Sequence, residues 1–225
     1  MVCVPAGPFL MGDDKRQVDV DEFWIGRAPV TNAEFTRFTK ATGYQTTAEE
    51  RGDSRVWTGS KWKTAKGANW RHPQGAESNI EGLMDHPVVH ISWHDAVTYV
   101  EWIGKRLPTE TEWEKAARGT DGREYPWGNE EPTPELCNFG RNEGGTTPVG
   151  RYSPQGDSPN GCVDMAGNVW EWTASDYEGG GKVLRGGSWY DVSNSARSAN
   201  RGRGLSNDSS NYSGFRCARD SACSC

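Results

Sequence analysis

The cysteines and histidines of this chain are the side chains best suited to redox chemistry or metal binding. Six cysteines stand at positions 3, 137, 162, 217, 223 and 225, and no two form a C-x-x-C pair. Most are therefore expected to be free or buried thiols; the alternative is one or two disulfides. His86, His90 and His94 follow each other at intervals of four, which would suit a metal on a helix. Pro87 and the strand-like run VVHISW argue against that helix, so no histidine metal site is expected.

A polar stretch near the C-terminus, Arg185 to Arg216, has the composition of a recognition surface. Residues 190–213 hold seven Ser, four Asn, two Tyr and two Asp, and only Val192 and Leu205 are aliphatic beyond alanine. Such a segment has no apolar period, so it predicts neither a buried strand nor an amphipathic helix. Strand-like segments, VLRGGSW and GFRCA, hold both its ends. Tyrosine as a rigid contact and Ser, Asn and Gly as adjustable contacts are typical of an adaptable binding face.

Composition and charge limit the fold and the partners. The net charge of −6 argues against nucleic-acid binding, for which a basic stripe is expected. No apolar run approaches the roughly 20 residues of a membrane span. No signal peptide is visible, so the protein is expected in the cytoplasm, or at a cell or phage surface through another segment. Eleven Trp and 28 Gly with 34% hydrophobic residues predict a loop-rich fold whose core is filled largely by indoles.

The elements that position the polar stretch are expected to form one α+β domain over residues 1–225. Thr31 and Glu34 make a capping box that predicts a helix near 32–42, and a second helical region is predicted over 94–118. The two main helices are expected to pack on small, twisted antiparallel sheets.

The rest of the chain is expected to be irregular structure and short strands. Strands are predicted near the N-terminus, in HPVVHISW, after DMAGNVWEW, in VLRGGSWY and in GFRCARD. Residues 44–85 and 130–162 are predicted to be long loops with short extended pieces.

Several phrases along the chain together resemble the formylglycine-generating-enzyme (sulfatase-modifying-factor) family over nearly all 225 residues. They are, in order, PAGPFLMG, APVTNAEFTRF, HPVVHISWHDAVTYVEW, RLPTETEWEKAARG, YPWGN, DMAGNVWEWT, LRGGSW and GFRCA. The resemblance implies a C-type-lectin-like fold of α+β class with much irregular structure. It also implies an oxidase that uses copper bound by two cysteines, the first about two residues past the aromatic of GGSW.

The polar stretch departs from that enzyme pattern. Asp191 stands at the first cysteine position, and no cysteine occurs between Arg185 and Arg216. Thiolate is the soft ligand that Cu(I) requires, and aspartate cannot replace it. Neither copper nor enzyme activity is therefore expected.

The polar stretch also resembles the variable region of diversity-generating-retroelement variable proteins, which present a hypervariable face on a lectin-like scaffold. The skeleton RGGSW, RSANR and GFR is present in that order. The resemblance implies a non-enzymatic protein that binds a protein or other surface ligand; the alternatives are an oxidoreductase of the formylglycine-generating type and a catalytically dead pseudoenzyme. The implied variable, ligand-binding positions hold residues reachable from an Asn codon: Tyr190, Asp191, Val192, Asn194, Ser195, Gly202, Gly204, Leu205, Asp208, Ser210, Asn211 and Tyr212.

The family resemblance implies a calcium site within DMAGNVWEW. Its ligands would be the side chains of Asp164 and Glu171 and the carbonyls of Gly167 and Val169, and oxygen ligands of this kind are those calcium prefers. The alternative is a metal-free turn in which Glu171 caps backbone N–H groups.

Two further groups of residues have competing interpretations. The arginines at 197, 201 and 203 could pair with anionic ligands, but interleaved arginines more often hold loop carbonyls. The tryptophans at 170, 172 and 189 could form a sugar-stacking platform, but they are expected to lie in the core.

Overall fold

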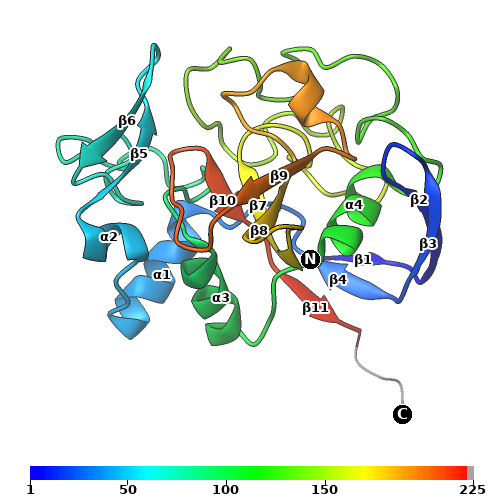
Figure 1. Ribbon diagram of the computed structural model, residues 1–225, viewed down its shortest axis with the longest axis horizontal. Helices are drawn as coiled ribbons and strands as arrows, with labels where there is room; N and C mark the ends of the chain where they lie inside the picture. Colours follow the sequence, from blue (N-terminus) through cyan, green and yellow to red (C-terminus); the bar gives the residue numbers. More distant parts are fainter. Residues whose placement is uncertain (222–225) are drawn as a thin grey trace.

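The computed structural model describes residues 1–221, which form short helices and strands joined by long irregular segments (Figure 1). The helices are α1 (Asn32–Thr42), α2 (Thr47–Arg51), α3 (Trp93–Trp102), α4 (Glu110–Arg118) and the 3-10 helix η1 (Ser193–Ala196). The strands are β1 (Val2–Val4), β2 (Gly7–Met11), β3 (Arg16–Val20), β4 (Phe23–Ile25), β5 (Asp53–Trp57), β6 (Trp62–Lys66), β7 (Trp170–Asp176), β8 (Lys182–Arg185), β9 (Arg201–Gly204), β10 (Ser213–Phe215) and β11 (Ala218–Asp220). This mixture confirms the predicted α+β class.

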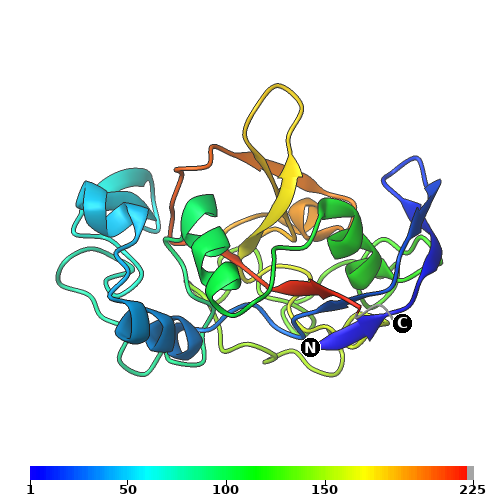
Figure 2. The ribbon, with the colours of Figure 1, turned by 90° about the horizontal axis from the view of Figure 1, so that it is seen from below.

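Two sheets carry the fold, and two strand pairs extend from it. The order β1-β4-β11 brings the first and last strands of the described chain onto the same neighbour, and the order β10-β7-β8-β9 leaves β9 at an edge. The pairs β2–β3 and β5–β6 lie at opposite ends of the molecule in both views (Figures 1 and 2). The expected antiparallel pairing holds except at β10, which runs parallel to β7 with Ser213 opposite Trp170.

The helices begin where local capping chemistry predicts. Thr31 accepts a hydrogen bond from the Glu34 amide at 3.3 Å, and Gly43, with φ 70°, ends α1. The helical region expected over 94–118 consists of α3 and α4, and α4 begins at the capping box of Thr109 and Glu112. The prediction of only loop and strand over 44–85 is wrong at α2, which has its own capping box between Thr46 and Glu49. Within residues 1–221, no helix is both long enough and apolar enough to cross a bilayer.

Indoles fill much of the core, as the composition predicts. Trp70, Trp113 and Trp172 are among the largest fully buried side chains. Trp170 and Trp189 are buried as well, which confirms the core interpretation and leaves no exposed sugar-stacking platform at these positions.

Left-handed backbone explains where predicted strands fail or end early. The segment HPVVHISW is buried but is not a strand, because His90 has φ 59° and turns the chain. The strand expected over VLRGGSWY ends at Arg185, because Gly186 and Gly187 have φ 96° and 71°. The strand expected over GFRCARD is divided between β10 and β11, which belong to different sheets.

Candidate ligand-binding face

A buried ion-pair network fixes the base of the polar stretch. The Glu114 carboxylate on α4 accepts hydrogen bonds from Arg118 at 2.7 Å and from Arg185 at the end of β8. These three side chains are at most 1% exposed. Arg185 also donates to the carbonyl oxygens of Ala199 at 2.9 Å and Asn200 at 2.7 Å. Helix α4 therefore holds the middle of the stretch through Arg185.

The interleaved arginines have structural partners. Arg197 pairs with Asp13 and, at 3.0 Å, with Glu124. Three further contacts involve β9: Arg201 pairs with Glu110 at 2.7 Å and with Glu178 at 3.2 Å, and Arg203 donates to the Gly180 carbonyl at 2.8 Å. Only Arg203 holds a loop carbonyl as that interpretation expects, whereas Arg197 and Arg201 pair with carboxylates and so tie the RSANR motif to acidic residues outside the stretch.

Asp191 anchors the start of the stretch. Its carboxylate accepts hydrogen bonds from the Trp170 indole N–H at 2.8 Å and from the Ser188 hydroxyl. Burial raises the pKa of this carboxyl above its ordinary value. The residue at the first cysteine position of the family pattern therefore makes structural contacts in this protein.

The twelve residues expected to bind ligand divide by exposure. The exposed ones are Val192, Asn194, Leu205 and Asp208; the partly exposed ones are Tyr190, Asp191, Ser195, Gly202 and Tyr212; and the buried ones are Gly204, Ser210 and Asn211. Val192 and Leu205 are 63% and 56% exposed, although both are aliphatic. Their side chains are therefore free to contact a ligand.

The buried members lie under neighbouring elements. Strand β5 covers the end of the stretch, where the Asn211 amide donates to the Arg55 carbonyl at 3.2 Å and Arg55 forms a parallel bridge with Ser210. Gly204 packs on Trp172, and a Cβ there would lie 2.3 Å from that ring. These positions support the face from below, and Gly204 and Ser210 also line the floor of a cavity beside the β5–β6 hairpin.

The β5–β6 hairpin forms a wall of the face that sequence reasoning missed. Ring centroids of Trp57 and Trp62 lie 4.5 Å and 4.9 Å from that of Tyr190, and Trp62 is 4.9 Å from Tyr212. The run WTGSKW, with a tryptophan at each end of a Gly-containing turn, is the signal that could have identified this hairpin.

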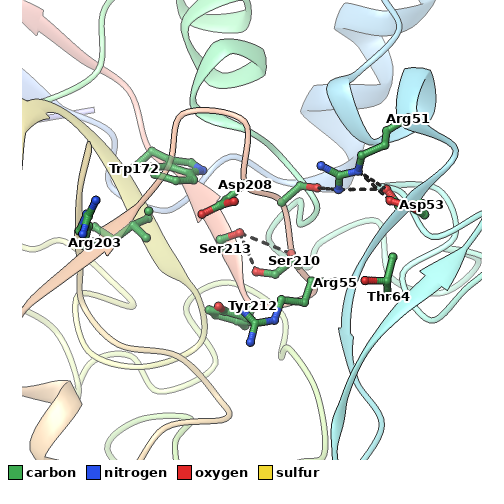
Figure 3. A pocket seen from close by; sticks show the side chains of 13 residues that line it. Arg51, Asp53, Arg55, Thr64, Trp172, Arg203, Asp208, Ser210, Tyr212 and Ser213 are labelled. Atoms are coloured by element: carbon green, nitrogen blue, oxygen red, sulfur yellow. Dashed lines mark hydrogen bonds and ion pairs between the residues drawn. The ribbon is translucent and has the colours of Figure 1, made fainter. Parts of the chain in front are cut away.

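Two neighbouring cavities open between the hairpin and strands β8 and β9. Their volumes are about 430 and about 260 Å3, and both are lined by Arg55, Leu184, Arg203 and Tyr212. Figure 3 shows the larger cavity, with Arg203 on one side and the Arg51–Asp53 ion pair on the other. We call the two cavities together the hairpin groove.

The residues expected to bind calcium come together, but their oxygens are partly occupied. Both oxygens of Glu171 accept hydrogen bonds from Arg216, at 2.6 and 2.7 Å, and one also accepts from Trp113. One oxygen of Asp164 accepts from the Gly150 amide at 2.6 Å. No cluster of three or more His, Cys, Asp or Glu suited to a metal occurs within residues 1–221. The donor set thus fits calcium only in part, with Asp164 and the two carbonyls as the freer ligands, and the site stays a prediction.

The thiols of the described residues are free, and most of them are buried. Cys3, Cys137, Cys162 and Cys217 are free, and the last three are buried; positions 223 and 225 lie outside the described residues. Burial raises the pKa of both the Cys137 and the Cys217 thiols to about 12, so both are protonated at neutral pH. A protonated thiol is a weak metal ligand.

Comparison with known proteins places this geometry in a family. The Sulfatase-modifying factor enzyme 1-like domain matches residues 1–221. The chain belongs to this family. The formylglycine-generating enzyme of Mus musculus is 36% identical over 98% of this chain and 75% of its own length. The Bos taurus protein named inactive C-alpha-formylglycine-generating enzyme 2 is 37% identical over 97% of this chain and 87% of its own length. The family thus includes an enzyme and an inactive relative, and membership alone does not decide activity.

A solved structure supports the fold. Treponema denticola variable protein 1 superposes with a TM-score of 0.71, at 21% identity, over 98% of this chain and 95% of that one. The expected C-type-lectin-like fold of the formylglycine-generating-enzyme type is confirmed.

Proposed function

We propose that this protein is a non-enzymatic ligand-binding protein whose recognition face is diversified by a retroelement. We define the recognition face as the exposed and partly exposed positions of residues 190–212. The observation that carries the proposal is that the side chains exposed on this face differ from those that hold its backbone, which we call the frame. The frame consists of buried or paired arginines, while Val192 and Leu205 stand exposed on it.

As a consequence, the exposed positions should tolerate substitution. An exposed side chain that packs on little can be exchanged with small effect on the free energy of unfolding. A rigid backbone also reduces the ordering cost of binding, so that new side chains can form a paratope without refolding. The proposal is also supported by Treponema denticola variable protein 1, a protein named as variable that has this fold.

An oxidoreductase of the formylglycine-generating type is the second candidate, and the identity to the Mus musculus enzyme favours it. The absence of cysteine between Arg185 and Arg216 weighs against it. The test is to load the purified protein with Cu(I), add a sulfatase-motif peptide and air, and measure aldehyde by mass spectrometry. We expect no aldehyde, with the Streptomyces coelicolor relative as positive control. Turnover by this chain would overturn the non-enzymatic part of the proposal.

Diversification has its own test at the DNA level. We expect a near copy of the segment encoding residues 185–216 close to the gene, differing from it at adenines, with a reverse-transcriptase gene beside it. If the locus holds no such copy, the retroelement is excluded and the pseudoenzyme without diversification becomes the better account.

A further inference from the structure

The hairpin groove contains arginines without carboxylate partners. Arg55 and Arg203 line both cavities, and neither lies within ion-pair distance of a carboxylate anywhere in residues 1–221. Arg141 is likewise unpaired over the same part of the chain, and it flanks the groove over the ring of Tyr190 at 5.4 Å. In a protein with a net charge of −6, three guanidinium groups without a carboxylate partner in the described residues thus gather around one groove.

The acidic side chains of the groove are already occupied. Asp53 accepts from Arg51 at 2.7 Å, and Asp208 accepts from the Leu205 amide at 2.8 Å. Asp191 is bonded to Trp170 and Ser188, as described above. The groove therefore offers guanidinium groups that pair with no carboxylate of residues 1–221, whereas each of its carboxylates already accepts a hydrogen bond. Asp191 and Asp208 accept theirs from uncharged donors and keep their negative charge.

The groove arginines are also held in place. The Arg55 guanidinium lies 5.0 Å from the centre of the Trp62 ring, and the Arg203 Nε donates to the Gly180 carbonyl. A guanidinium stacked on an aromatic ring loses less conformational entropy when it binds a carboxylate, and it can do so with two parallel hydrogen bonds. Strand β5 is itself fixed to the polar stretch through the Arg55–Ser210 bridge.

We propose that the hairpin groove binds an acidic, extended segment of a protein ligand, with Arg55 and Arg203 pairing with its carboxylates and Trp62 as a fixed wall. This inference rests on the proposed recognition function and adds to it a ligand chemistry and a set of constant contact residues. Substitution at the two tyrosines that touch Trp62, Tyr190 and Tyr212, then reshapes the groove against a wall that does not change.

The test uses a 20-residue oligoglutamate as the probe and the full chain as the protein, with binding measured by calorimetry. We expect weak but saturable binding that weakens as NaCl rises from about 50 to about 300 mM, because exposed ion pairs are screened. Arg55→Gln should lower the affinity about threefold to fivefold, the effect of losing one exposed ion pair. Arg37→Gln removes an exposed arginine on α1 that pairs with no carboxylate of residues 1–221 and does not line the groove, and it should change the affinity less than about twofold.

Several outcomes would overturn the inference. Binding that is undetectable at about 1 mM oligoglutamate would exclude an acidic ligand segment, since even weak specific complexes are measurable there. An equal loss of affinity in Arg37→Gln would mean that the net charge of the protein, and not the groove, determines binding. Equal binding of oligolysine, or tighter binding of single-stranded DNA of the same charge, would replace the acidic protein segment with another partner. Unchanged urea unfolding of Arg55→Gln is the folding control. None of these outcomes bears on whether a template copy lies beside the gene, so the groove proposal can fail while the proposed function stands.

Discussion

Replacing Glu114 by glutamine is the sharpest test of how the recognition face is held. The Glu114 carboxylate accepts from the Gly12 amide and from Arg118, both at 2.7 Å, with one oxygen, and from Arg185 with the other. Glutamine keeps one acceptor oxygen, but it puts an NH2 group against a guanidinium and removes the negative charge. Arg118 and Arg185 are then two fully buried cations without their counter-ion.

The expected loss follows from that burial. Removing one partner of a buried ion pair costs about 3–5 kcal/mol, because the remaining charge is left uncompensated. Burial already lowers the pKa of the Arg185 guanidinium below its ordinary value, and the Glu114 charge is the largest influence that opposes this. We expect Glu114→Gln to lower the free energy of unfolding by about 3–5 kcal/mol, which is a large share of the roughly 5–15 kcal/mol of a typical domain.

Urea unfolding and hydrogen exchange measure the two consequences. Glu143→Gln is the control, because it breaks an exposed ion pair with Arg151 at 3.0 Å and should cost less than about 1 kcal/mol. Exchange should accelerate in the peptide that spans residues 198–200, whose carbonyls Arg185 holds. A loss below about 1 kcal/mol in Glu114→Gln, or unchanged exchange in that peptide, would refute the role of α4 as the anchor of the face.

Three further predictions concern pH and calcium. Burial raises the pKa of the Asp164 carboxyl to about 6, above the roughly 3.9 of an unfolded chain. The contribution of this carboxyl to stability is therefore full below about pH 4 and lost as pH rises through 6. Without calcium, Asp164→Asn should raise the free energy of unfolding, measured with urea, by about 2 kcal/mol at pH 7.5 and by little at pH 4.5. A lower free energy of unfolding at pH 7.5 would contradict this. Calcium should raise the Tm of the parent protein at pH 7.5 and EDTA should reverse it, with no shift in Asp164→Ala; if the Tm of the parent does not respond, the site is disproved. Burial lowers the pKa of His90 to about 4, below the roughly 6.5 of an unfolded chain, so that its contribution is present above pH 6.5 and lost as pH falls through 4. The folded His90 ring should accordingly stay neutral at pH 5.5 by NMR, and titration near 6.5 would count against its burial.

Helix starts could be predicted from the sequence where short-range capping interactions determine them. The capping box of Thr31 and Glu34 lies within one helical turn, so a three-residue spacing is enough to place the start of α1. The same pattern at Thr46 and Glu49 begins α2, and it was missed because the five residues of that helix show no apolar period.

Contacts between distant segments could not be predicted in the same way. The bridge between Arg55 and Ser210 joins positions far apart in sequence, and nothing near either residue specifies it. This one contact between β5 and the polar stretch buries Ser210 and Asn211, and it also places the β5–β6 hairpin beside the face. Gly204 is similar, because only the packed Trp172 ring shows that a side chain has no room there.

The structure separates residues that can change from residues that cannot, and the division does not follow codon chemistry. Codon reachability places Gly204 and Asn211 in the same class as Val192 and Leu205. Packing does not, because a Cβ at Gly204 meets Trp172 at 2.3 Å, whereas Val192 and Leu205 are more than half exposed. A recognition face that varies on this frame is therefore confined to its exposed and partly exposed positions, since substitutions beneath it disturb the β5 contact and the Trp172 packing on which the groove depends.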